Sequence, residues 1–411
     1  MTTASAASPP LSLLRHPSFM MFWGARVFTN GAYAMQSVAV GWQIYDLTNN
    51  PFDLGLVGLV MFFPMVLTGV LGGQISDYFD RRRVAAACQV AKAIATLVLM
   101  AGSFGGWLSR DAILGIMFVV AVGRALEIPT LHALLPGIVP QPILPRAIAA
   151  SATAQQTATI AGPAIGGFLY LLGPGTVYAT CAACFLIASV LISLVHAEPR
   201  SIEKKKVTLE TIFAGFTYLR GHPLLMGVIS LDLFAFLLGG VTALLPIFAR
   251  DILETGPWGL GILRSAPAVG ALLMSVWLSR HAIERRAGQV LFISIAVFGL
   301  STILFALSTS LILSVFALAV YGAADAVSVV IRHSLVQMRT PNEMLGRVLA
   351  VNTVFTGTSG TMGEFRAGAV AALLGAVPSA LIGGVGAVLV AAIWWKAFPQ
   401  IGRIEKLAPD P

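Results

Sequence analysis

The chain has 411 residues, of which 57% are hydrophobic and only 11% are charged. Soluble domains carry about 25% charged residues, so this chain has too few charges to cover the surface of a soluble protein of its size. Lipid is expected to cover it instead. The formal net charge is +8, but no basic stripe is interleaved with aromatic residues, so nucleic acid is not an expected partner.

Apolar runs long enough to cross a bilayer as helices, about 20 residues each, recur along the chain. They predict an all-α membrane protein with two six-helix halves. The expected spans are 18–46, 54–76, 84–107, 112–133, 146–170, 175–196, 223–249, 257–280, 288–308, 311–335, 347–373 and 377–398. The expected organisation is an N-terminal tail (1–17), a first half (18–196), a linker (197–222), a second half (223–398) and a C-terminal tail (399–411).

Lys and Arg are distributed unevenly between the two sets of loops. If both termini are cytoplasmic, 18 of the 26 basic residues lie on the cytoplasmic side, and only Arg110 and Arg250 lie on the other side. This bias predicts cytoplasmic termini. The linker contains a second signal, because apolar residues recur in it at helical spacing and predict an amphipathic helix on the membrane surface. These residues are Leu209, Ile212, Phe213, Phe216 and Leu219.

The two halves resemble each other at a constant offset. Adding 203 to the positions of four residues of the first half gives the same residue types at the equivalent point of the second half. The pairs are Gly58 and Gly261, Pro64 and Pro267, Arg82 and Arg285, and Arg83 and Arg286. Repeated six-helix halves around a central site are typical of secondary transporters.

The loop after the second span carries a glycine, an aspartate four residues later and an arginine cluster: Gly73, Asp77, Arg81, Arg82 and Arg83. It resembles the signature loop of the major facilitator superfamily, although Tyr78 and Asp80 replace the usual Arg and Gly. We expect it to be a conformational latch, in which charged side chains bind a neighbouring helix end. The alternative is that the arginines only set the topology.

Three further segments sharpen the resemblance. Gly162-Pro163-Ala-Ile-Gly166-Gly167 in the fifth span is similar to a motif of drug antiporters, where small residues and a proline permit close packing and bending. The segments 11–17 and 337–347 resemble the bacterial enterobactin-exporter branch. The resemblance implies a monomeric antiporter of the bacterial inner membrane, exporting siderophores, drugs or other amphipathic molecules in exchange for protons.

Ionisable side chains within the spans cost at least about 2.5–3.5 kcal/mol each at mid-depth and so need a partner or a function. Arg124 and Glu127 lie three residues apart on one helix face, so Glu127 is expected either to pair with Arg124 or to take the proton. Arg26 is expected to join this cluster or to bind an anionic cargo. Lys92 is expected to reach the cytoplasmic surface.

Asp325 in the second half is the first candidate for proton coupling, followed by Glu364 in the same half and then Glu127 in the first half. Asp232 in the second half is a further candidate. Arg332 lies seven residues after Asp325, so a structural ion pair is the alternative for that residue. The arginines expected to hold these acids or a cargo are Arg264 and Arg366. Glu364 and Arg366 are two residues apart and do not share a helix face.

Other functional classes find little support in the sequence. The three cysteines, Cys88, Cys181 and Cys184, lie in apolar stretches without a metal-ligand pattern. No P-loop, H-E-x-x-H motif or nucleophile elbow occurs, so no enzyme activity, cofactor or metal is expected. Transport of lysophospholipid or another lipid is the main alternative, and a membrane enzyme or sensor is a remote one.

Overall fold

The computed structural model describes Leu13 and residues 16–78, 80–196, 209–281, 283 and 285–405, with only the backbone of 65–78 and 209–213. The regular secondary structure in this part of the chain is entirely helical. Its long helices are α1 (Pro17–Thr48), α2 (Pro51–Tyr78), α3 (Arg81–Gly105), α4 (Arg110–Leu134), α5 (Leu144–Leu169), α6 (Pro174–Leu194), α8 (Pro223–Gly239), α10 (Gly256–Arg280), α11 (Ala287–Leu307), α12 (Leu311–Arg339), α13 (Asn342–Leu374) and α14 (Ala376–Ala397). Eleven of the twelve expected spans therefore each correspond to one helix, with ends that differ by a few residues, and the seventh is broken.

Eight segments of the described chain are both long and apolar enough to cross a membrane, namely α3, α4, α6, α10, α11, α12, α14 and the stretch Pro223–Ile252 that starts with α8. The other long helices, α1, α2, α5 and α13, have 32, 28, 26 and 33 residues, enough to span a core of about 30 Å. They pack on one another and on the opposite half, with α2 against α13 and α5 against α10. Helices that face protein can carry more polar side chains than helices that face lipid.

The seventh expected span is not a continuous helix. α8 ends at Gly239, and Gly240 is extended with φ −65° and ψ 123°. The chain continues through the short turns η5 (Thr242–Leu244), α9 (Leu245–Ile247) and the π-helix η6 (Phe248–Ile252). A Cβ atom at Gly239 would lie 2.5 Å from the ring of Phe298, so only glycine fits at the point where the helix ends.

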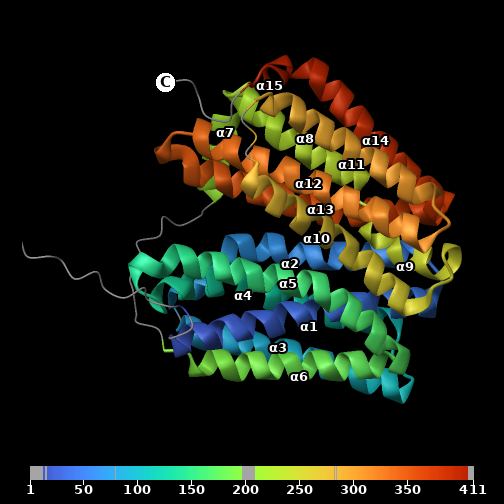
Figure 1. The fold of residues 1–411 in the computed structure, drawn as a ribbon. Coiled ribbons are helices and arrows are strands. Elements are labelled where there is room, and N and C mark those ends of the chain that lie inside the picture. The colour runs from blue at the N-terminus through green and yellow to red at the C-terminus, as the bar shows by residue number, and fades with distance from the viewer. Residues whose placement is uncertain are drawn as a thin grey trace, which may run out of the picture.

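α1–α6 form one bundle and α8–α14 form the other (Figure 1). The repeat expected from the sequence is a repeat of packing as well. Pro64 lies inside α2 and Pro267 inside α10, the second helix of each bundle. A Cβ at Gly58 would lie 3.1 Å from the carbonyl oxygen of Thr361 on α13, and one at Gly261 would lie 2.5 Å from that of Pro163 on α5. The second helix of each half thus crosses the fifth helix of the other.

The short helix α7 (Leu209–Arg220) occupies the second part of the linker. Its Leu219 is buried in a cluster that includes Leu225 of α8 and Val348 of α13. A Cβ at Gly215 would lie 2.5 Å from the carbonyl oxygen of Arg347 on α13. The helix forms as expected, but the described part of its apolar face packs against protein, whereas the sequence suggested a membrane surface.

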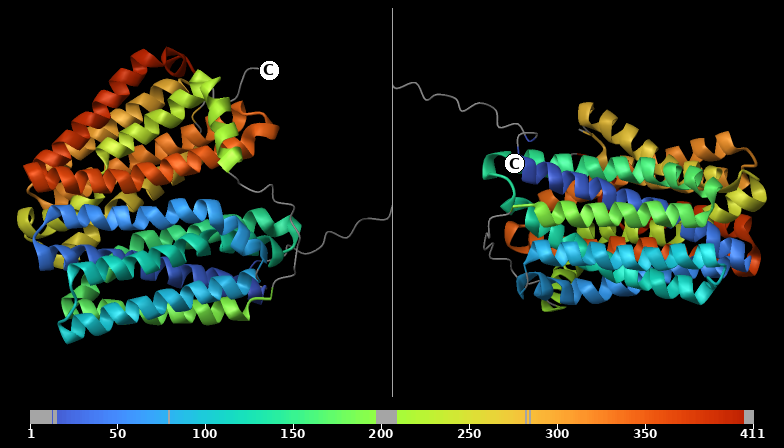
Figure 2. Two further views of the ribbon diagram at one scale, coloured as in Figure 1. Left: turned by 180° about the vertical axis from the view of Figure 1, so that it is seen from behind. Right: turned by 90° about the horizontal axis from the view of Figure 1, so that it is seen from below.

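The two bundles lie close together at the end that holds α9 and diverge toward the end that holds α7 (Figures 1 and 2). The contacts between halves agree with this arrangement. Phe52 at the start of α2 packs edge-to-face on Phe365 of α13, with ring centroids 5.8 Å apart. Gly167 near the end of α5 packs against Pro257 at the start of α10.

Candidate transport site

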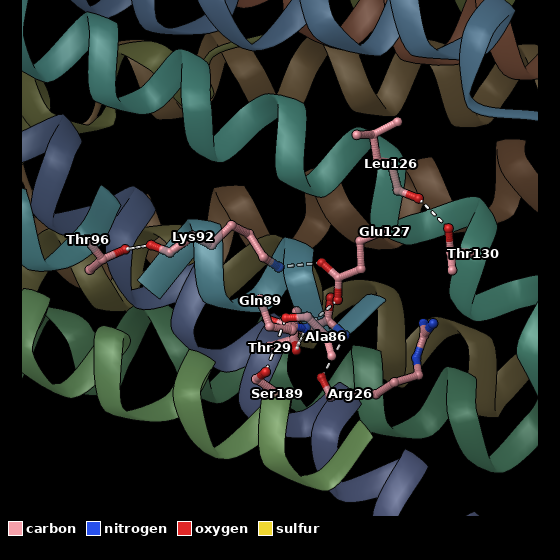
Figure 3. A network of polar contacts seen from close by, with 11 residues as sticks. Arg26, Thr29, Ala86, Gln89, Lys92, Thr96, Leu126, Glu127, Thr130 and Ser189 are labelled. Atoms are coloured by element: carbon pink, nitrogen blue, oxygen red, sulfur yellow. Dashed lines mark hydrogen bonds and ion pairs between the residues drawn. The ribbon is translucent and has the colours of Figure 1, made fainter. Parts of the chain in front are cut away.

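The first half contains a buried ion pair between α3 and α4. Lys92 binds the carboxylate of Glu127, and both side chains are 2% exposed. Gln89 donates to the other oxygen of Glu127 at 2.5 Å and also contacts the Thr29 hydroxyl at 2.5 Å. Figure 3 shows Lys92 and Gln89 converging on Glu127 from the same helix. Lys92 is therefore a structural partner of Glu127 and does not reach the surface as expected.

Arg124 takes a different partner from the one its spacing suggested. Its guanidinium carbon lies 3.6 Å from the centroid of the Tyr33 ring on α1, a cation–π contact. Arg26 is also buried, with 7% of its surface exposed, and it donates to the side-chain oxygen of Gln155 on α5 at 2.8 Å. Arg26 interacts electrostatically with both Glu127 and Arg124, so the expected cluster of Arg26, Arg124 and Glu127 does form.

The second half has an ion pair of its own. Arg332 of α12 lies 3.2 Å from Asp232 of α8, and their side chains are 2% and 3% exposed. Arg332 also donates to Asn352 at 3.0 Å and to Thr356 at 2.8 Å, both on α13. Ser328 donates to Asp232 at 3.4 Å. One arginine thus links three helices, which ties this bundle together.

Asp325 differs from the other acids. Arg332 has turned to Asp232, so the alternative ion pair seven residues along the helix does not form. The Oδ1 atom of Asp325 is buried and has no hydrogen-bond partner among the described residues. Asp325 and Glu364 both interact electrostatically with Tyr321, which places the two first-ranked acids in the same neighbourhood.

Arg264 joins this neighbourhood to the first half. It interacts electrostatically with Glu364 and with Tyr33 of α1, and its guanidinium nitrogen would lie 3.3 Å from a Cβ atom at Gly41. A series of charged and aromatic side chains therefore runs from Arg124 through Tyr33 and Arg264 to Glu364. The sequence suggested that Arg264 would hold an acid from the seventh or eleventh span, and Glu364, in the eleventh, is the acid with which it interacts electrostatically.

Arg366 has a separate position from Glu364, as their spacing requires. It donates to the carbonyl oxygen of Gly240 at 3.4 Å, which is the residue at which α8 gives way to extended backbone. Its Nε and Nη1 atoms are buried without a hydrogen-bond partner in the described structure. Arg366 thus binds the broken seventh span.

Two of the three arginines of the signature loop bind helix ends. Arg81 donates to the carbonyl oxygen of Ala133 in the last turn of α4 at 3.0 Å, and Arg82 donates to that of Val195 at the end of α6 at 3.3 Å. Cations at helix C-termini complement the helix dipole. Gly73 and Asp77 are in α2, but their side-chain surroundings lie outside the described structure, so their part in a latch stays a prediction.

The glycines of the fifth-span motif let α5 lie close to two helices. Gly162 and Gly166 face α1, where added Cβ atoms would lie 2.6 Å from Ala34 and 2.8 Å from Met35. Gly167 faces α10, where a Cβ would lie 2.6 Å from the Pro257 carbonyl oxygen. Pro163 lies inside the helix between them. Gly167 therefore contributes to the contact between the halves, whereas Gly162 and Gly166 let α5 pack closely on α1 within the first half.

A polar contact between the halves was not expected from the sequence. Tyr45 at the end of α1 donates a short hydrogen bond to Asp251 of η6. Arg250 lies 3.6 Å from Asp46 and donates to the Tyr45 carbonyl oxygen at 3.3 Å. We call Tyr45, Asp46, Arg250 and Asp251 the clasp. The only available signal was that Asp46, at the outer end of the first expected span, and Arg250, directly after the seventh, have opposite charge and lie on the same side of the expected topology.

Known proteins resemble the chain along almost its whole length. A family model described as transmembrane secretion effector matches residues 7–408. The enterobactin exporter EntS of Escherichia coli O81 (strain ED1a) is 26% identical over 407 residues, which cover 97% of this chain and 96% of that protein. The corresponding exporter of Shigella boydii serotype 18 (strain CDC 3083-94 / BS512) is also 26% identical over the same shares of both chains.

Solved structures show the same fold at lower identity. The nucleoside transporter NupG superposes with a TM-score of 0.72 at 16% identity and covers 93% of this chain and 99% of its own. A D-xylose-proton symporter gives 0.68 at 16% identity, covering 95% and 100%. The chain therefore belongs to the transmembrane secretion effector family, and it is a multi-pass membrane transporter with the major facilitator fold.

Proposed function

We propose that this transporter exports an amphipathic small molecule from the cytoplasm in exchange for protons. The relatives that are named as exporters act on enterobactin, so a siderophore-like molecule is the first cargo class to test and a drug-like molecule the second. We place the transporter in the bacterial inner membrane with both termini in the cytoplasm, since this topology puts the arginine loop and the basic linker inside.

The contacts between the halves support transport by alternating access. They gather at the end with the clasp, while the bundles diverge toward the α7 end (Figure 1). With the termini in the cytoplasm, this conformation is open toward the cytoplasm. Rocking of one half against the other would then open the clasp end and close the α7 end.

The unpartnered oxygen of Asp325 is the observation that carries proton coupling. Glu127 and Asp232 each hold an ion-pair partner, and Glu364 interacts with Arg264. Protonating any of these acids would leave a cation without its partner inside the membrane, which is costly. Asp325 can gain and lose a proton at Oδ1 without breaking an ion pair, so we propose it as the proton carrier.

The test uses the full chain in proteoliposomes, with enterobactin as the first probe and a panel of amphipathic drugs as the second. A pH gradient should drive cargo movement by the wild type, and Asp325→Asn should abolish this dependence. Glu343→Gln is the matched control, because it makes the same acid-to-amide change at an exposed position in the first turn of α13. Cargo movement that is equally fast with and without the gradient would refute proton coupling.

A further inference from the structure

In the described part of the first half, three cationic side chains lie near one buried carboxylate. Lys92, Arg124 and Arg26 interact electrostatically with the single carboxylate of Glu127 or with one another. Three cations against one carboxylate leave a surplus of two positive charges. All four side chains are in helices α1, α3 and α4.

The surplus belongs to Arg26 and Arg124. Both oxygens of Glu127 are taken, one by Lys92 and the other by Gln89. Arg26 instead contacts the neutral amide of Gln155, and its Nε atom is buried without a hydrogen-bond partner in the described structure. Arg124 has an aromatic ring as its contact. Neither contact supplies a negative charge, either to Arg26, which is buried, or to Arg124, which is partly buried within the bundle.

We propose that Arg26 and Arg124 bind the acidic part of the cargo, so that the transported molecule is an amphipathic anion with two negative charges. A guanidinium pair suits this role because each presents several donors in a fixed plane to an oxygen anion. Tyr33, stacked on Arg124, offers its ring to the apolar part of the same molecule. This inference rests on the proposed function and adds the charge of the cargo to it.

The placement of the two arginines agrees with a cargo site. Tyr33 interacts electrostatically with Arg264 of the second half, and Arg26 reaches α5, a helix that packs on the second half through α10. The pair therefore lies on the side of the first bundle that faces the second. A ligand bound here touches the boundary across which the halves move.

The test measures binding alone, with the full chain in nanodiscs of uncharged lipid and no pH gradient. Equilibrium dialysis compares naphthalene-1,5-disulfonate, a dianion, with naphthalene-1,5-dimethanol, which has the same ring system and no charge. The wild type should retain the dianion in preference to the neutral probe. Arg26→Gln and Arg124→Gln should each weaken retention of the dianion at least about tenfold, the effect expected from losing a charged hydrogen bond.

Three controls separate binding from folding. Arg146→Gln removes an exposed arginine at the start of α5 and should leave retention unchanged. Arg26→Lys and Arg124→Lys keep the positive charge, so they should recover part of the dianion retention that the glutamine variants lose. In the absence of ligand, Arg26→Gln should not lower the thermal midpoint, because it relieves surplus charge. Equal retention of both probes, or unchanged dianion binding by both glutamine variants, would overturn the inference and leave proton-coupled export standing.

Discussion

The ion pair between Lys92 and Glu127 leads to a quantitative prediction. Glu127→Gln keeps the shape of the side chain but removes its charge, and Lys92→Met removes the opposing charge. Each single variant leaves one charge buried in a site where the side chains are only 2% exposed. The double variant removes both charges of the pair. Its loss of unfolding free energy should therefore be smaller than the sum of the losses in the two single variants.

The expected sizes follow from the burial of the pair. Removing one partner of a buried ion pair costs about 3–5 kcal/mol, whereas replacing both partners by uncharged groups is often close to neutral. We therefore expect each single variant to lose about 3 kcal/mol or more of unfolding free energy. The double variant should recover part of that loss, with a coupling energy of at least about 2 kcal/mol.

The assay is reversible unfolding of the purified protein in mixed micelles, followed by helical circular dichroism. Arg83→Gln provides the reference for an exposed pair, because Arg83 lies 3.9 Å from Asp80 and its side chain is 83% exposed. Such pairs contribute about 0–1 kcal/mol. Additive effects of Lys92→Met and Glu127→Gln would refute the reasoning. Retention of proton-driven transport by the double variant would assign Glu127 a structural role.

Three more predictions concern the contacts between helices. Tyr45→Phe removes the hydroxyl that binds Asp251, a loss of about 1 kcal/mol in a partly buried contact, and should raise hydrogen exchange at the α1–α2 connection. An unchanged exchange rate would argue against the clasp. Gly261→Val should abolish transport, since the valine side chain would collide with α5. Gly360→Val is the control and should not abolish it, because position 360 has open space around it. Equal transport rates in the two variants would contradict this. Arg82→Gln should lower the thermal midpoint through loss of its bond at the end of α6, and an unchanged midpoint would count against that role.

The helices themselves could be predicted from the sequence because lipid leaves few alternatives. Every backbone amide in the bilayer must be bonded within its own segment, so an apolar run of sufficient length becomes a helix. The end of α8 at Gly239 could not be predicted in this way, since hydropathy does not indicate where a helix ends inside the membrane. Two adjacent glycines were the available signal, and the ring of Phe298 lies against the first of them, Gly239.

Ion-pair partners could not be predicted in the same way. Spacing along one helix suggested that Arg124 would pair with Glu127 and Arg332 with Asp325. Neither ion pair is present in the described structure. The partner of Glu127 is Lys92 on α3, and the partner of Arg332 is Asp232 on α8. A contact between helices depends on how they rotate and cross, which spacing within one helix does not report.

The location of the buried charges bears on how the halves can move. Each ion pair whose two side chains are almost fully buried in the described structure lies within one half, Lys92 with Glu127 in the first and Asp232 with Arg332 in the second. The ion pair that crosses between halves, Arg250 with Asp46, has side chains 31% and 58% exposed, and such pairs contribute about 0–1 kcal/mol. Much of the remaining contact is glycine against backbone. Separating the halves at the clasp end therefore breaks weak contacts and leaves both buried pairs intact, so each half can move as a rigid body.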